Sequence, residues 1–341
     1  MLITEEPIFR RFWYPTLRLE ELADGPKPFT LLKEDIVLWQ QADGAPAALE
    51  DKCPHRSVKL SVDSLVVDGT LRCGYHGWRF AGDGGCVLVP QTPDLAPPAR
   101  NAAKAYHCRE RYGYVWVCLE EPVRDIPDLP HADDPGFRQV FEYQETWDAN
   151  ALRIGENALD LSHVSFVHRE TFGEDESPVS PDLDLFEMED GVGIRCYVPV
   201  ANREDQQKNL NIADDHTLRK MKITWRLPAV FTIRITYPTG LIHQIIGFTT
   251  PIDDERTHRC QFVYRNDTEA DAPGENVAAF DRRVAAEDRR ILETTGPDYP
   301  LDLHAEAHMV LDRPGILMRQ ILADWLDGPP EERAGLETAA E

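Results

Sequence analysis

The sequence predicts an α+β protein of two domains, an N-terminal antiparallel β domain and a C-terminal domain with a helix-flanked antiparallel sheet. Short strand-like runs separated by turn signals fill residues 29–117, where no long helical pattern occurs. A proline-bearing stretch at residues 120–136 is typical of a linker. Beyond it, strand-like runs between residues 185 and 264 lie between two helical segments, residues 152–168 and 274–294.

These patterns place a first domain at residues 1–135 and a second at residues 136–326, followed by a tail at residues 327–341. A chain of 341 residues, 42% of them hydrophobic, is long enough to bury a core in each of two domains. The tail is rich in Gly, Pro and Glu, and we expect it to be mobile.

Composition excludes several classes of function. No apolar run of about 18 residues or more occurs and no signal-peptide pattern opens the chain, which predicts a soluble cytoplasmic protein. The formal charge of −24 argues against nucleic acid and anionic membranes as partners, and weakly favours a neutral or cationic substrate. Seven cysteines at scattered spacings argue against a disulfide framework.

In the first domain we expect strands at residues 30–41 and 45–50, and a last strand at residues 108–119 in which side chains alternate between two faces. The predicted turns are Asp43-Gly44, Asp68-Gly69 and Asp83-Gly84-Gly85. A small antiparallel β domain of this kind can hold a metal cluster at its loop tips.

Two pairs of soft ligands occur in this domain. Cys53 and His55 form the first pair, and Cys73 and His76 follow after seventeen intervening residues. Thiolate and imidazole together suit zinc or an iron–sulfur centre. Zinc fingers usually pair like with like, whereas each pair here contains one Cys and one His. If the two loop tips face each other, both Cys can bind one iron and both His the other, which is the Rieske [2Fe–2S] arrangement.

Neighbouring residues fit such a cluster. Gly74 and Gly77 are expected to let backbone N–H groups approach the cluster sulfurs, and Trp78 and Phe80 to keep water out. Two alternatives are open: a zinc ribbon, and a pair of plain β-turns in which the cysteines are buried apolar residues.

The helical segment at residues 152–168 contains Asp160, His163 and His168. Mononuclear non-haem iron enzymes bind the metal through two His and one carboxylate, which leaves positions for O₂ and substrate. His163 and His168 would point about 140° apart on one regular helix. The helix must therefore end or widen into a π-type turn between them. The alternative is that these are capping or core histidines.

The carboxylate ligand is expected on the helix at residues 274–294, where Asp288 occupies an apolar stripe. Asp281 lies at the edge of that stripe and is a weaker candidate. Asp312 precedes the helical run after Pro314, so N-capping explains it well. The residues expected to line a substrate pocket are Phe166, Trp225, Phe231 and Ile233.

The segments CPHR and CGYHGW resemble those of the Rieske non-haem iron oxygenases, the ring-hydroxylating and demethylating family. The similarity extends to FRRFWYP at residues 9–15 and HCRERYGYVWVCL at residues 107–119. It is strongest to the homo-oligomeric branch, which includes aromatic O-demethylases, caffeine-type N-demethylases and saxitoxin-pathway hydroxylases. The family pattern D-x-x-H-x-x-x-x-H matches Asp160, His163 and His168, and the family's E-D pair matches Glu287-Asp288.

The resemblance implies an oxygenase component that hydroxylates or oxidatively demethylates a small aromatic, heterocyclic or alkaloid-like substrate. Electrons from NAD(P)H would reach the [2Fe–2S] cluster through a ferredoxin or flavin reductase. Mononuclear Fe(II), held by His163, His168 and Asp288, would bind O₂. The resembling enzymes form head-to-tail homotrimers, which implies that Asp160 links a cluster histidine of one chain, expected to be His76, to His163 of the next.

Two other functions use all or part of this ligand set. A cis-dihydroxylating aromatic dioxygenase uses the same ligands, so motifs do not separate it from a monooxygenase. A Rieske electron carrier would leave the second domain inert, and the D-x-x-H-x-x-x-x-H pattern argues against it.

Overall fold

The computed structural model describes residues 1–173, 178, 182–210 and 212–328. The chain forms two compact units, an N-terminal unit of Glu6–Pro127 and a C-terminal unit of Met1–Glu5 with Asp128–Glu341. The boundary predicted after residue 135 stays a prediction. Apart from Asp327 and Gly328, the predicted tail lies outside the described residues.

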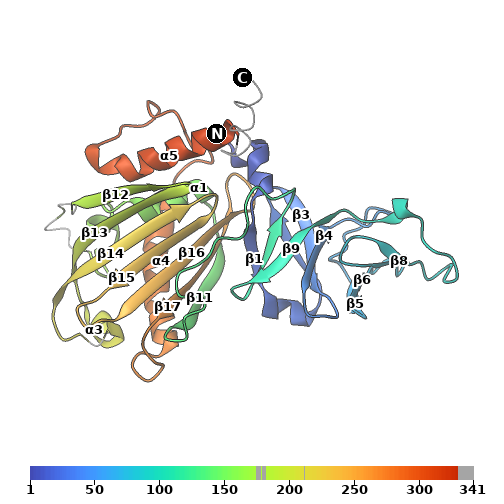
Figure 1. Cartoon of the computed structure of the whole chain (residues 1–341), viewed down its shortest axis with the longest axis horizontal. Coiled ribbons are helices and arrows are strands. Elements are labelled where there is room, and N and C mark those ends of the chain that lie inside the picture. Colours follow the sequence, from blue (N-terminus) through green and yellow to red (C-terminus); the bar gives the residue numbers. More distant parts are fainter. Residues whose placement is uncertain (174–177, 179–181, 211, 329–341) are drawn as a thin grey trace, which may run out of the picture. The chain divides into compact units, whose positions relative to one another are not determined.

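The N-terminal unit is built from antiparallel strands, as predicted (Figure 1). Its strands are β1 (Tyr14–Arg18), β2 (Lys27–Leu31), β3 (Glu34–Gln40), β4 (Pro46–Glu50), β5 (Leu65–Val67), β6 (Thr70–Arg72), β7 (Arg79–Phe80), β8 (Cys86–Leu88), β9 (Ala105–Arg111) and β10 (Tyr114–Cys118). One sheet has the order β1-β10-β9-β4-β3-β2, and the other has the order β5-β6-β7-β8. Short 3₁₀ helices occur in this unit at Pro7–Arg11, Leu19–Asp24 and Ala99–Asn101, and in the C-terminal unit at Ile3–Glu5 and Val310–Asp312.

The three predicted turns are confirmed, but two predicted strands are in fact hairpins. The run at residues 30–41 reverses at Leu32 and Lys33, which have φ of 51° and 63°. The run at residues 108–119 reverses at Tyr112 and Gly113, with φ of 60° and 82°. Side chains of β10 alternate between the two faces of the sheet, as predicted, and both of these faces are buried. Because β10 lies between β1 and β9, neither of its edges is left to solvent.

The C-terminal unit is a seven-stranded antiparallel sheet with helices against it, which confirms the predicted α+β class (Figure 1). The strands are β11 (Arg138–Trp147), β12 (Leu183–Met188), β13 (Gly191–Ala201), β14 (His216–Arg226), β15 (Val230–Thr236), β16 (Ile242–Pro251) and β17 (Thr257–Arg265). The helices are α1 (Ala151–Leu159), α2 (Val164–Val167), α3 (Glu204–Leu210), α4 (Gly274–Leu292) and α5 (Arg313–Leu326). The strand order is β11-β17-β16-β15-β14-β13-β12.

The helix predicted across residues 152–168 breaks earlier than expected. α1 ends at Leu159, and Asp160 already has extended backbone angles of −83° and 131°. The Asp160 carboxylate accepts the Ser162 N–H at 2.6 Å, a local turn that competes with helix continuation. The break therefore precedes His163, and the separate helix α2 lies between the two histidines without a π-type turn.

One further expectation changes. Asp312 does precede α5, but its carboxylate accepts the N–H of Met309 at 2.7 Å and caps no helical N–H. Between β13 and β14 the chain forms the short helix α3. Across the part of the chain that the structure describes, no helix combines the length and apolar character that crossing a membrane requires.

Candidate metal centres and active-site cavity

The two Cys–His pairs of the N-terminal unit lie on loops of matching geometry. Cys53 N–H donates to Val58 O and Cys73 N–H donates to Trp78 O, each at 2.8 Å. Directly before the two acceptor residues, Ser57 and Gly77 adopt left-handed backbone angles, with φ of 57° and 73°. The loops are therefore two copies of one turn, as expected for a cluster held at paired tips.

The four candidate ligands converge between these loops. The rings of His55 and His76 are 4.6 Å apart, and the Trp78 ring stacks on His55 at 4.5 Å. Both cysteines are 2% exposed, and Nδ1 of His55 is buried without a hydrogen-bond partner in the described part of the chain. Burial, with a smaller contribution from the neighbouring Cys73, raises the pKa of Cys53 to about 11. Buried thiols of this kind become thiolates when a metal binds them, so these residues fit a [2Fe–2S] cluster.

The N–H groups of the two glycines in the second loop bind within the protein, and the predicted approach of other backbone N–H groups to a cluster stays a prediction. Gly74 N–H donates to Ser64 Oγ at 3.1 Å, and Gly77 N–H donates to Cys73 O at 3.0 Å, so neither is free for a cluster sulfur. A Cβ on Gly74 would lie 2.6 Å from Asp63 O. Glycine is needed at position 74 because another loop passes too close for a side chain.

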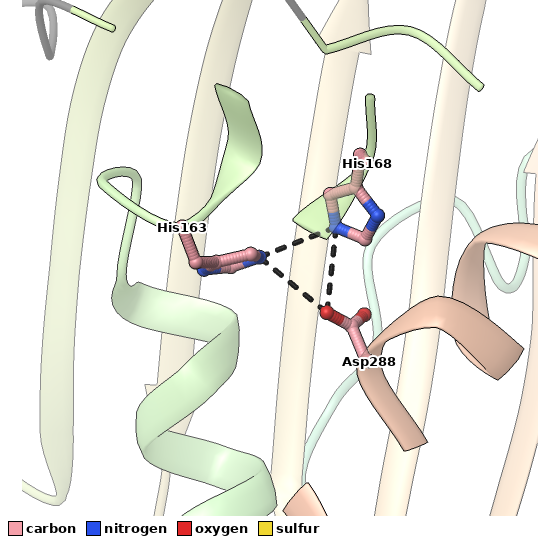
Figure 2. A group of neighbouring side chains, drawn as sticks. All are labelled: His163, His168 and Asp288. Carbon is pink, nitrogen blue, oxygen red and sulfur yellow. Dashed lines mark hydrogen bonds and ion pairs between the residues drawn. The ribbon is translucent and has the colours of Figure 1, made fainter. Parts of the chain in front are cut away.

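A second group of ligand atoms converges in the C-terminal unit. His163 directly precedes α2, His168 directly follows it, and Asp288 lies on α4. Figure 2 shows the three side chains pointing toward one another. The Nε2 atoms of the two histidines are 3.2 Å apart, and Asp288 Oδ1 lies 3.5 Å from His163 Nε2 and 3.4 Å from His168 Nε2. The sequence pattern predicted this grouping from segments that are far apart along the chain.

Each histidine is oriented by a carboxylate on its far side. His168 Nδ1 donates to Glu287 Oε2 at 2.9 Å, and Thr171 Oγ1 donates to the same oxygen at 2.8 Å. His163 Nδ1 lies 3.3 Å from Asp160 Oδ2. With both Nδ1 atoms protonated, the Nε2 lone pairs face the third carboxylate. Sequence reasoning assigned no role to Glu287, although its place beside Asp288 is a usable signal.

The electrostatics of this group fit a cation. Asp288 Oδ1 is buried and has no hydrogen-bond partner among the described residues. Burial works to lower the pKa of His163, but Asp160 and Asp288 together raise it above its ordinary value. Two imidazole lone pairs and a carboxylate oxygen at van der Waals distance repel one another unless a proton or metal lies between them. The set of two His and one carboxylate is that of mononuclear non-haem iron sites.

The group opens onto a cavity between the sheet and helices α1 and α4. Phe231 and Ile233, two of the predicted lining residues, do line it. The other two do not: Phe166 is 56% exposed, and Trp225 is fully buried beneath Gly155 of α1. Aliphatic and aromatic side chains form the larger part of the lining, and polar or charged side chains form the rest, a combination that suits a small organic ligand.

Glu287 gives a prediction about metal affinity. Glu287→Ala removes the hydrogen bond that orients His168, and we expect iron affinity to fall by about 10- to 100-fold. Iron retained after equilibrium dialysis against a chelator measures this. Glu275→Ala, at an exposed position in the first turn of the same helix, is the matched control. Equal iron retention in both variants would show that Glu287 does not position His168.

Comparisons with known proteins agree with both centres. Residues 12–99 match the Rieske [2Fe-2S] domain, and residues 147–328 match the vanillate O-demethylase oxygenase C-terminal domain. Methylxanthine N1-demethylase NdmA of Pseudomonas putida is 28% identical over 98% of this chain and 94% of its own length. The structure of NdmA with caffeine has a TM-score of 0.80 at 28% identity, covering 95% of this chain and 92% of that one.

A second relative is the oxygenase component of dicamba O-demethylase from Stenotrophomonas maltophilia, 37% identical over 47% of this chain and 48% of its own length. The resemblance stated from the sequence motifs is thereby confirmed. The chain carries a Rieske domain and an oxygenase domain, and its relatives are oxidoreductases. It belongs to the Rieske non-haem iron oxygenases with a vanillate O-demethylase-type C-terminal domain.

Proposed function

We propose that this oxygenase removes a methyl group from the oxygen or nitrogen of a small aromatic or heterocyclic compound. The observation that carries the proposal is the convergence of His163, His168 and Asp288 at the wall of an apolar cavity. The relatives support the reaction type, because NdmA is a methylxanthine N-demethylase and the dicamba enzyme an O-demethylase. Hydroxylation of the methyl carbon yields a hemiaminal or hemiacetal, which releases formaldehyde.

Each candidate ligand has a stated role. Cys53, His55, Cys73 and His76 would hold the [2Fe–2S] cluster, and His163, His168 and Asp288 would hold the mononuclear iron. When bound, the two groups supply one-electron transfer and O₂ activation. The protein's own part is to keep both histidines in one tautomer through Asp160 and Glu287 and to surround the substrate with apolar side chains.

The reaction needs electrons, which we propose come from NAD(P)H through a ferredoxin or flavin reductase. O₂, an electron pair and two protons convert a methyl ether or methylamine into the demethylated product, formaldehyde and water. We further propose a homotrimer in which Asp160 of one chain connects its own His163 with a cluster histidine, His76, of the neighbouring chain. The contact between Asp160 and His163 supports one half of this connection.

Asp160→Ala tests that connection. With iron supplied in excess to offset any loss of affinity at His163, we expect the variant to keep both metal centres but to lose oxygenation by about 100-fold, because the carboxylate proposed to connect His163 with the neighbouring cluster is missing. Iron content and the rate of product formation are measured together. The control is Asp148→Ala, an exposed aspartate just before α1. Normal turnover in Asp160→Ala would rule out the proposed role.

Demethylation itself is tested by reducing the cluster chemically and following its reoxidation in air. A panel of O- and N-methylated aromatics and heterocycles is compared with the unmethylated parents, with formaldehyde and hydroxylated product assayed in each reaction. A compound that accelerates reoxidation and yields formaldehyde supports the proposal. Oxygenated product without formaldehyde would instead establish hydroxylation. No acceleration by any compound, with iron analysis finding the cluster alone, would overturn the assignment of the second centre.

A further inference from the structure

Arg219 is a buried cation in the lining of the cavity that lacks an acidic partner. It lies on β14, is 3% exposed, and donates through Nη2 to Gln206 Oε1 at 2.8 Å. Its Nε is buried without a hydrogen-bond partner, and no carboxylate in the described part of the chain forms an ion pair with it. A guanidinium in this state is poorly compensated.

Two other buried arginines of the C-terminal unit are paired with carboxylates. Arg265 is paired with Asp267, and Arg319 with Glu156 and Glu306. Arg259, which also lines the cavity, donates through Nη1 to two backbone carbonyls and through Nη2 to the Gln261 side chain, although its Nε, like that of Arg219, is buried without a partner among the described residues. Arg219 has fewer of its donors in use than these arginines, because Nη2 alone has a hydrogen-bond partner among the described residues.

Aromatic rings compensate Arg219 only in part. Its guanidinium carbon lies 4.7 Å from the ring centroid of Phe172 and 5.7 Å from that of Tyr237. Such cation–π contacts offset some of the cost of burying the charge but satisfy none of the N–H donors. A carboxylate offsets the charge and also accepts hydrogen bonds from the N–H donors, because its two oxygens match the forked geometry of the guanidinium group.

The same ring connects Arg219 to the candidate iron site. Phe172 stacks on His168 with centroids 4.9 Å apart, and Arg219 lies 4.7 Å from Phe172, so the guanidinium carbon is within about 10 Å of the His168 ring. A single aromatic ring can span this distance between an anionic group and a methyl group. Apolar side chains of the lining lie beside Arg219, among them Met221 and Ile223 on β14 itself and Ile235 on the neighbouring β15.

The acidic groups of the lining are already engaged. Asp281 Oδ2 lies 3.0 Å from His243 Nε2, and burial together with Asp281 raises the pKa of Glu142, a neighbour of Asp281 that is not part of the lining. Glu142, His243 and Asp281 are close enough to ligate a metal, but Arg265 Nη1 occupies His243 Nδ1 at 2.9 Å. The positive charge of Arg265 acts on this group, whereas no carboxylate in the described part of the chain forms an ion pair with Arg219.

From these contacts we propose that the substrate is an anion, an aromatic or heterocyclic carboxylate whose carboxylate pairs with Arg219 while its methyl group faces His163, His168 and Asp288. The inference rests on the proposed function, because it takes this cavity as the substrate site. It reverses the weak expectation of a neutral or cationic substrate that the net charge of −24 suggested. Net charge describes the whole surface, whereas a buried cavity is selective through the few charges within it.

The test is ligand-dependent thermal stability of the holoenzyme in air without reductant, so that binding is measured without turnover. The probes are 2-, 3- and 4-methoxybenzoate and N-methylpyrrole-2-carboxylate, each compared with its neutral carboxamide. We expect at least one acid at saturation to raise the melting temperature by about 2–5 °C and its amide to have little effect. Arg219→Gln should abolish the shift. The control is Lys220→Gln, which removes an equal charge from the exposed, opposite face of β14.

A second readout separates a ligand-binding role from a structural one. If Arg219 pairs with substrate, Arg219→Gln without ligand should melt no lower than the wild type, because it removes an uncompensated buried charge. If the residue only holds the fold together, the variant melts lower. Equal shifts from acid and amide, no shift from any acid, or a shift that survives in Arg219→Gln would each overturn the inference.

Failure of the inference and failure of the proposed function give different results. Formaldehyde from neutral compounds alone, without any acid-dependent shift, would reject the anionic substrate and leave demethylation standing. An acid-dependent shift that requires Arg219, without formaldehyde from any bound acid, supports the anion site and rejects demethylation.

Discussion

Replacing His163 with alanine is expected to remove the mononuclear iron and to abolish oxygenation while the cluster stays in place. His163 Nε2 lies within 3.5 Å of both other candidate ligand atoms, so its loss leaves one imidazole and one carboxylate. Two ligands hold Fe(II) too weakly to survive dialysis. We expect iron at this site to fall below about one-tenth of the wild-type occupancy, with the visible absorption of the cluster unchanged.

The matched control is His304→Ala, which removes an exposed histidine of the same unit. Metal analysis and visible absorption spectra are recorded for both variants. Bleaching of the cluster in His163→Ala would contradict the separation of the two centres. Full iron retention would show that His163 is not a ligand.

Replacing Cys73 with alanine is expected to eliminate the cluster. Cys73 is 2% exposed on a loop whose partner loop carries Cys53, and the two thiols lie close enough to raise the pKa of Cys53. With one thiolate missing, one iron would keep a single protein ligand, and the cluster would not assemble. The expected result is loss of the visible absorption and of the acid-labile sulfide, with no electron transfer to the second centre.

Cys86→Ala is the control for this change. Cys86 is a half-buried thiol packed against the same hydrophobic cluster as Cys53 and Cys73, so its loss tests thiol removal as such. The control should keep its colour. A coloured Cys73→Ala protein, or a colourless Cys86→Ala protein, would contradict the ligand assignment.

Much of the fold could be predicted because its signals are local. Turns with an Asp-Gly pair were found, since these residues tolerate left-handed backbone angles. The reversal at Leu32 and Lys33 was missed because neither residue type favours positive φ, and the hairpin is imposed by the pairing of β2 with β3. The end of α1 was missed because it depends on a hydrogen bond from the Ser162 N–H to the Asp160 carboxylate, and hydrophobic periodicity does not predict such a contact.

The candidate ligands could be predicted because chemistry restricts which residue types bind iron, but the pocket could not. Trp225 has the same strand parity as Ile223 and Arg219, which line the cavity, so its face was correct. Its access to the cavity was predicted wrongly, because α1 covers the Trp225 ring at Gly155, where a Cβ would lie 2.6 Å from Trp225 Nε1. The importance of Arg219 likewise depends on what surrounds it rather than on its position in the sequence.

The central claim is that one chain holds two different iron centres. Its most direct test is the ratio of iron to acid-labile sulfide in the purified protein, measured with the ratio in His163→Ala. We predict about three iron atoms and about two sulfides per chain, falling to about two irons with unchanged sulfide in the variant. Two irons and two sulfides in the wild type, unchanged in the variant, would contradict the claim and leave a protein with a cluster but no oxygen-activating site.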